Sequence, residues 1–146
     1  MTMNGMGMDI SDINNDGYPD IYISNDFHEN DYLYINNGDG TFTEQLTEMI
    51  AHTSRSSMGN DVADINNDGL LDIYVSNAGN LEGNNHDNDL YINNGDLTFT
   101  EKAAEYNLAK TGFSTHASFF DYDKDGDLDA YILNNSNIPV SSLGYA

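Results

Sequence analysis

Three acidic segments of the chain place oxygen-bearing side chains at fixed positions, and this pattern can bind a metal ion. In each segment positions 1, 3, 5 and 9 are Asp or Asn, and position 6 is Gly, which permits the sharp turn of a ligand loop. The side chains are Asp12, Asn14, Asp16 and Asp20; Asp64, Asn66, Asp68 and Asp72; and Asp121, Asp123, Asp125 and Asp129. Oxygen ligands without His or Cys favour Ca²⁺, whereas Mg²⁺ prefers a tighter octahedron with retained water. We therefore expect three Ca²⁺ sites, each completed by the backbone carbonyl at position 7, from Tyr18, Leu70 and Asp127.

Two alternatives to this interpretation use the same residue types. The EF-hand loop begins in the same way, but it needs a bidentate Glu at position 12 and a following helix. Position 12 is Ile23, Val75 or Ile132, each within a strand-like pattern, so the EF-hand is excluded. Ordinary polar turns also contain Asp, Asn and Gly. Three copies in the same register favour metal loops over such turns.

The acidic segments belong to a longer internal repeat. They begin at Asp12, Asp64 and Asp121, at intervals of 52 and 57 residues. A second block, residues 33–44, returns as residues 90–101, and the additional residues of the longer interval fall in the Gly/Asn-rich stretch 77–88. We therefore expect one domain over residues 1–146, with repeat 1 at about 5–56, repeat 2 at about 57–113 and a partial repeat 3 at about 114–146.

Each repeat has the pattern of short β-strands. Residues rich in β-branched and aromatic types precede and follow each acidic loop, and an Asn-Gly turn then joins two further strands as a hairpin. Residues 44–51 and 101–108 lack strand alternation, and we expect a helical turn there. Four strands in about 50 residues suit a propeller blade. The fold class is therefore all-β, a partial β-propeller of about two and a half four-stranded antiparallel blades, with the acidic loops between first and second strands.

The number of blades is lower than a closed propeller requires. Closed propellers use roughly four to eight blades, so we expect this chain to be a fragment. The first and last sheets then each leave an apolar face uncovered. The remaining blades of a parent chain are the expected partners of these faces.

The loop pattern together with the hairpin resembles a known repeat family. Asp-x-Asn/Asp-x-Asp-Gly-x-x-Asp between two strands, followed by Leu-Tyr-x-Asn-Asn-Gly-Asp-Gly-Thr-Phe, resembles the FG-GAP/VCBS repeat over about residues 5–135. Such repeats build the propeller of integrin α-subunits and occur in secreted bacterial proteins, including relatives of cartilage acidic protein. The resemblance implies Ca²⁺ at the four side-chain positions of each loop, and an extracellular or cell-surface setting. Two departures are that Gly40 becomes Leu97 in the second hairpin and that the third repeat lacks its hairpin.

The charge of the chain limits its partners. It has 25 Asp and Glu against 4 Lys and Arg, a formal net charge of −21. We therefore expect neither nucleic acid binding nor membrane insertion, because anionic partners would be repelled and no apolar run approaches the length of a membrane span. Cysteine is absent, which excludes disulfides and thiolate sites. The first residues do not resemble a signal peptide, so we expect any export signal to lie outside this sequence.

Three classes of function remain open. The preferred one is a Ca²⁺-stabilised module that binds a protein or a glycan, through the propeller face or the loop at residues 77–88. A second is the scaffold of a polysaccharide lyase or hydrolase whose catalytic residues lie elsewhere in the parent chain. A third is a purely structural repeat of a surface protein. We expect no catalytic residue in this sequence, because His28, His52, His86 and His116 lack a supporting nucleophile and oxyanion context.

Overall fold

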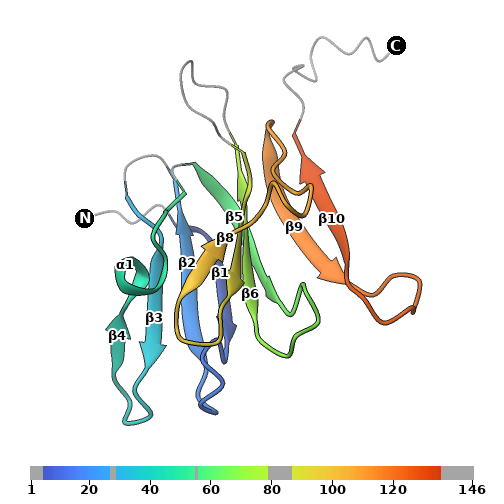
Figure 1. The fold of residues 1–146 in the computed structure, drawn as a ribbon. Coiled ribbons are helices and arrows are strands. Elements are labelled where there is room, and N and C mark those ends of the chain that lie inside the picture. The colour runs from blue at the N-terminus through green and yellow to red at the C-terminus, as the bar shows by residue number, and fades with distance from the viewer. Residues whose placement is uncertain (1–4, 27–28, 55, 79–86, 136–146) are drawn as a thin grey trace, which may run out of the picture.

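The computed structural model describes residues 5–26, 29–54, 56–78 and 87–135, which form three antiparallel sheets arranged side by side (Figure 1). Blade 1 consists of β1 (Gly5–Ser11), β2 (Asp20–Asn25), β3 (Tyr32–Asn36) and β4 (Phe42–Glu44), followed by the helix α1 (Leu46–Met49). Blade 2 consists of β5 (Ser57–Ala63), β6 (Asp72–Asn77), β7 (Asp89–Asn93) and β8 (Phe99–Glu101). Blade 3 consists of β9 (Ser114–Phe120) and β10 (Asp129–Asn134). Within these ranges no helix is long and apolar enough to cross a membrane.

The expected strand pattern and fold class are confirmed. Blades 1 and 2 are four-stranded sheets whose strands pair in chain order, and the acidic segments join the first strand to the second. Of the two expected helical turns, the first is α1. The second forms a turn and no helix, and in it the backbone N–H of Tyr106 donates to the carbonyl of Lys102 at 3.2 Å.

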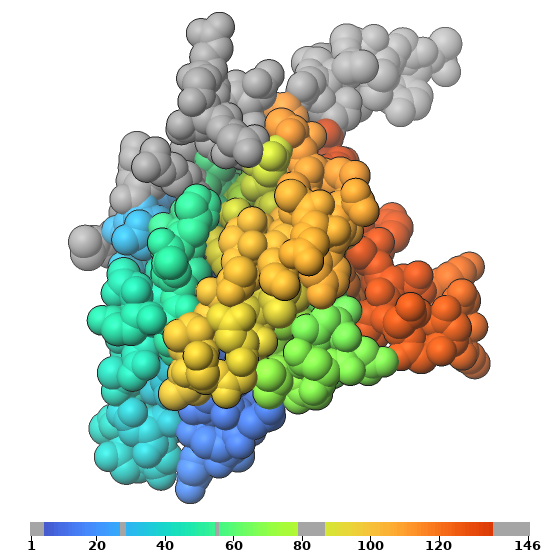
Figure 2. Space-filling model, in the orientation of Figure 1, coloured from blue at the N-terminus to red at the C-terminus, as the bar shows by residue number. Residues whose placement is uncertain are grey.

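The blades stack because the strands of blade 2 are apolar on both faces. The innermost strands β1, β5 and β9 lie next to one another. On β6, Ile73 and Val75 pack into a core shared with blade 1, whereas Tyr74, between them, packs into a core shared with blade 3. Successive side chains of a strand point to opposite faces of a sheet. Blade 2 is therefore enclosed on both sides, as a propeller blade is, and Figure 2 shows the three blades in contact.

One hairpin turn contains an unfavourable residue. In the β3–β4 turn Gly40 has a φ of +88°, and in the β7–β8 turn Leu97 takes the equivalent place with a φ of +68°. Leu97 is 52% exposed, so packing contributes little in return. A side chain with a β-carbon is strained in this left-handed conformation by about 1–2 kcal/mol. Glycine removes the strain but loses more entropy on folding.

We expect Leu97→Gly to raise the free energy of unfolding by about 0.5–1 kcal/mol. The reciprocal change, Gly40→Leu, should lower it by about 1 kcal/mol or more, because its β-carbon has free space and only the backbone is strained. Urea denaturation of both variants measures the two effects. If both substitutions changed the free energy of unfolding in the same direction, the left-handed backbone conformation would not be what determines the stability of this turn.

Candidate metal centre

The three acidic loops lie at the same end of the three sheets, toward the bottom of Figure 1. They connect β1 to β2, β5 to β6 and β9 to β10. Because each loop joins two antiparallel neighbours, its first ligand follows one strand directly and its ninth begins the next. The sheet therefore fixes both ends of every candidate site.

In the first two loops the side chains at positions 1, 3 and 5 lie close together. The carboxylate of Asp12 accepts the backbone N–H groups of Asp16 at 2.9 Å and Gly17 at 2.8 Å. The side-chain amide of Asn14 donates to Asp16 Oδ2 at 2.9 Å. The second loop repeats these bonds with Asp64, Asn66, Asp68 and Gly69. The recurrence shows that the loop sequence itself determines this arrangement.

In the first two loops the carboxylate at position 9 is buried and braces the loop against the rest of its blade. Asp20 and Asp72 have no exposed surface. Asp20 Oδ2 accepts the N–H of Ile13 at 2.9 Å, and Asp20 Oδ1 accepts the N–H of Asn36 in β3 at 2.8 Å. Asp72 makes the equivalent pair with Ile65 and Asn93. Each carboxylate thus joins its loop to the third strand, a role that the sequence interpretation missed.

Burial raises the pKa of both Asp20 and Asp72, although the backbone N–H groups act in the opposite direction. Asp16 and Asp68 at position 5 also raise these pKa values, by charge repulsion. A nearby cation would reverse this effect, because it favours the ionised form of a carboxyl group.

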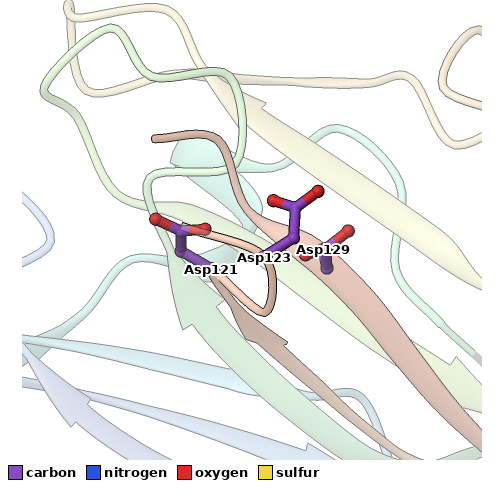
Figure 3. Close-up of side chains that lie close together, drawn as sticks. All are labelled: Asp121, Asp123 and Asp129. Atoms are coloured by element: carbon purple, nitrogen blue, oxygen red, sulfur yellow. The ribbon is translucent and has the colours of Figure 1, made fainter. Parts of the chain in front are cut away.

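The third loop gathers its carboxylates most closely. Asp121, Asp123 and Asp129 each offer an oxygen atom, and these atoms lie within 4.8 Å of one another. Figure 3 shows the three side chains at the turn between β9 and β10. All three are exposed, and the Oδ2 atom of Asp129 accepts the N–H of Tyr122 at 2.9 Å. The donor set consists of hard, anionic oxygens, so the residues present fit a Ca²⁺ ion.

Asp125 and Asp127 lie beside this group. Asp125 Oδ1 accepts the N–H of Asp127 at 3.2 Å. A hydrogen bond between the two carboxyl groups lowers the pKa of Asp125, as does the backbone N–H of Asp127, and the same side-chain bond together with charge repulsion from Asp125 raises the pKa of Asp127. Ligation by Asp125 and by the position 7 carbonyls of Tyr18, Leu70 and Asp127 stays a prediction, as does ligation by the other loop residues.

Position 4 links one loop to the next and was not recognised as a link in the sequence. Asn15 and Asn67 have left-handed φ values of 57° and 62°. The amide of Asn15 donates to the carbonyl of Gly69 at 3.5 Å, and that of Asn67 donates to Gly126 at 3.3 Å. The position 4 side chains therefore point away from their own loops. The available signal was the recurrence of Asn at this position in repeats 1 and 2.

The loop carboxylates are not neutralised by side-chain cations in the described part of the chain. The two ion pairs found there join His52 to Asp89 and Lys102 to Glu105, neither of which is a loop residue. Like charges held a few ångströms apart repel one another unless a counterion offsets them. The loops therefore offer concentrated negative charge to a cation from solution.

The two histidines in the described part of the chain, His52 and His116, belong to no assembled catalytic group there. His52 and His116 are exposed, and the nearest acidic partner of His52 is Asp89, at 3.9 Å between Nδ1 and Oδ1. His28 and His86 lie outside the described residues, as do residues 79–86 of the loop that we expect to bind a ligand.

Comparison with known protein families agrees with this geometry. The model of the family described as FG-GAP-like repeat matches residues 12–75 and 78–132. The two matches together cover most of the chain and include all three acidic loops. No curated protein matches the sequence.

Proposed function

The chain belongs to the FG-GAP-like repeat family and forms a β-propeller-like repeat module, and on this premise we propose that it binds Ca²⁺ in its three acidic loops. The observation that carries the proposal is the group of Asp121, Asp123 and Asp129, whose oxygens lie within 4.8 Å of one another. The first two loops support it, because in both of them the side chains at positions 3 and 5 make the same hydrogen bond. A bound Ca²⁺ would supply charge neutralisation and oxygen coordination at this point.

The residues of each loop have distinct parts in this proposal. Positions 1, 3 and 5 offer side-chain oxygens from the loop itself, and position 9 offers a carboxylate from the start of the second strand. Asp20 and Asp72 already accept two backbone N–H groups each, so they hold the loop in shape while their oxygens retain lone pairs. A ligand shared between loop and strand converts binding free energy into folding free energy.

Calorimetric titration with Ca²⁺ tests the loop register. We expect Asp68→Ala to remove one equivalent of binding, or to weaken that site by at least tenfold, because position 5 lies among the ligands. Asn67→Ala is the matched control in the same loop, and it should keep three equivalents because its amide points to Gly126. Asn67→Gly relieves the left-handed backbone strain and serves as a second control. Equal losses for Asp68→Ala and Asn67→Ala would contradict the assigned positions.

We further propose that the module works outside the cell or at its surface, where it binds a protein or a glycan. The net charge of −21 disfavours binding to nucleic acid and to anionic membranes. Extracellular modules commonly bind Ca²⁺ with a Kd of roughly 10⁻⁴–10⁻³ M.

Glycan arrays and purified extracellular proteins, probed with and without chelator, test this role. Ca²⁺-dependent binding is the expected result. Binding to neither class would favour a structural repeat, and product release from a polysaccharide would favour the enzyme scaffold.

A further inference from the structure

The acidic loops of blades 1 and 2 are joined by a chain of hydrogen bonds between buried residues. The N–H of Ile13 donates to Asp20 Oδ2 at 2.9 Å, and the carbonyl of Ile13 accepts the side-chain amide of Asn93 at 3.2 Å. The N–H of Asn93 in turn donates to Asp72 Oδ1 at 2.9 Å. All four residues are buried. The chain of bonds therefore runs from the position 9 carboxylate of the first loop to that of the second.

Asn93 makes this connection in addition to a role that both hairpins share. Asn36 occupies the same place in blade 1, and the N–H of each Asn donates to the position 9 carboxylate of its own blade. The side-chain amide of each Asn also donates to the carbonyl just before position 9, from Pro19 in blade 1 and Leu71 in blade 2. The bond from Asn93 to Ile13 crosses from one blade to the other. The hairpin of blade 1 forms with the shared bonds, so the crossing bond has a separate role.

A second contact joins the same two loops at the surface. Asn15 is exposed, and its side-chain amide donates to the carbonyl of Gly69 at 3.5 Å. The N–H of Gly69 donates to Asp64 Oδ2 at 2.9 Å, so the residue that Asn15 contacts also holds a candidate ligand. This contact is long and lies in water, which makes it the weaker of the two. The first loop is thus connected to the second at position 4 and, through the buried chain of bonds, at position 9.

Buried hydrogen bonds make the positions of the linked groups depend on one another. A buried polar group that loses its partner finds no water in its place, so it stays unsatisfied at a cost in free energy. From this chain of bonds we propose that the first and second loops bind Ca²⁺ cooperatively, with Asn93 as the positioning residue that couples them, a role that rests on the Ca²⁺ sites proposed above. A fixed Asp72 carboxylate orients Asn93, Asn93 holds Ile13, and Ile13 holds the Asp20 carboxylate of the first loop.

The coupling between the two loops has a defined sign and size. Occupation of either loop should tighten binding at the other by about fivefold or more, and by the same factor in both directions, because the coupling free energy of two sites is reciprocal. Repulsion between two bound cations acts against this effect. Salt screens that repulsion, with a Debye length of about 3 Å at 1 M, so titrations in 1 M KCl measure mainly the hydrogen-bonded coupling.

Nuclear magnetic resonance titration with Ca²⁺ follows each loop separately. The N–H groups of Gly17 and Gly69 donate to carboxylates of their own loops, so their signals report the first and the second loop. Asp68→Ala empties the second loop, and the Kd of the first loop should then rise by about fivefold or more. Asp16→Ala empties the first loop and should raise the Kd of the second by an equal factor. Asp125→Ala in the third loop is the control, and it should leave the Kd of the first loop within about twofold.

Asn93→Ala tests the buried chain of bonds itself. It keeps the backbone N–H that donates to Asp72 but removes the donor to Ile13. Asp68→Ala in this background should therefore change the Kd of the first loop by less than about twofold. Asn36→Ala is the matched control, because it removes the equivalent amide from blade 1. The coupling factor should be retained in that variant.

Hydrogen exchange gives a second readout, on a loop that holds no ion. In Asp16→Ala the first loop is empty, yet Ca²⁺ should slow the exchange of the Ile13 N–H, because the filled second loop holds it through Asn93. The slowing should exceed that of the N–H groups of β2, which report the global stability of the fold. Addition of Asn93→Ala should make the two effects equal. A merely structural role of Asn93 would lower stability without removing this difference.

Three results would overturn the coupling. If the Kd of each loop stayed constant or fell when the other loop was emptied, the sites would not be cooperative, although the Ca²⁺ proposal would stand. Unequal factors in the two directions would assign the changes to local damage. Signals of Gly17 and Gly69 that do not shift with Ca²⁺ would exclude binding, and with it any coupling. If Asn93→Ala is unfolded in circular dichroism, the reciprocal factors in the unaltered background still decide between coupled and independent loops.

Discussion

Removal of Ca²⁺ by excess chelator should lower the melting temperature of the chain by about 20 °C or more. When the free Ca²⁺ concentration is about 100 times the Kd of a site, that site contributes about 2.7 kcal/mol to folding, so three such sites contribute about 8 kcal/mol. One kcal/mol corresponds to roughly 2–4 °C for a domain near this size. The effect is this large because the unfolded chain has no preformed site and the loop carboxylates repel one another in the absence of an ion. Differential scanning calorimetry measures it.

The matched control for this experiment is the same chelator already saturated with Ca²⁺, at equal ionic strength. It should leave the melting temperature unchanged. Asp68→Ala should reduce the difference between the two conditions by about one third, since one of three sites is lost. A melting temperature that is equal with free and saturated chelator would reject a stabilising role for Ca²⁺.

The strands and the places of the acidic loops between them were predictable because they depend on local patterns that recur. The acidic loops lie between first and second strands as expected, since Gly17 and its equivalents adopt left-handed turns that few other residues tolerate. The hairpins were predictable from their Asn-Gly turns. The strain at Leu97 was not, because the residue departs from the pattern and only the backbone conformation reveals its cost.

The second role of the position 9 carboxylates could not be predicted, because it depends on tertiary contacts. Asp20 was assigned as a ligand from its spacing, but its bond to the N–H of Asn36 joins residues 16 apart in the sequence. The side-chain amide of Asn93 in blade 2 likewise donates to the carbonyl of Ile13 in blade 1. The recurrence of Asn36 and Asn93 in the second block was visible, but a single sequence does not show which backbone group an Asn contacts.

Polar contacts between blades at the end opposite the acidic loops were also missed. Asp31 is buried and accepts the N–H of Asn25 at 2.9 Å, the hydroxyl of Ser57 at 3.0 Å and the phenol of Tyr22 at 2.8 Å. The same place in blade 2 is Asn88, which accepts the N–H of Asn77 at 2.8 Å and donates to Ser114 at 3.0 Å. An amide thus fulfils in blade 2 the structural role that a carboxylate fulfils in blade 1.

Asp89, next to Asn88, is a carboxylate for which the repeat offers no equivalent, since repeat 1 has Tyr32 there. It is 9% exposed, and the amide of Asn77 donates to Asp89 Oδ2 at 2.9 Å. Burial raises the pKa of Asp89 to about 6, the Asn77 amide and the charge of His52 oppose this rise, and the carboxylates of Glu101 and Asp31 add to it. The folded chain therefore binds this proton more tightly than the unfolded chain.

Asp89→Asn should consequently stabilise the chain at neutral pH. A rise in the pKa from 3.8 to about 6 corresponds to about 3 kcal/mol, by which ionisation of Asp89 destabilises the fold once the pH exceeds both values. The stability contributed by the protonated group is fully present below pH 3.8 and is lost as the pH rises to about 6. The amide of the variant cannot ionise and can still accept the hydrogen bond from Asn77. The free energy of unfolding should therefore rise by up to about 3 kcal/mol at pH 7 and by little near pH 4.

Urea denaturation at both pH values measures the gain. Glu48→Gln removes an exposed carboxylate on α1 and serves as the control for net charge. A gain of equal size at both pH values would mean that repacking, rather than the ionisation of a buried carboxyl group, accounts for the change.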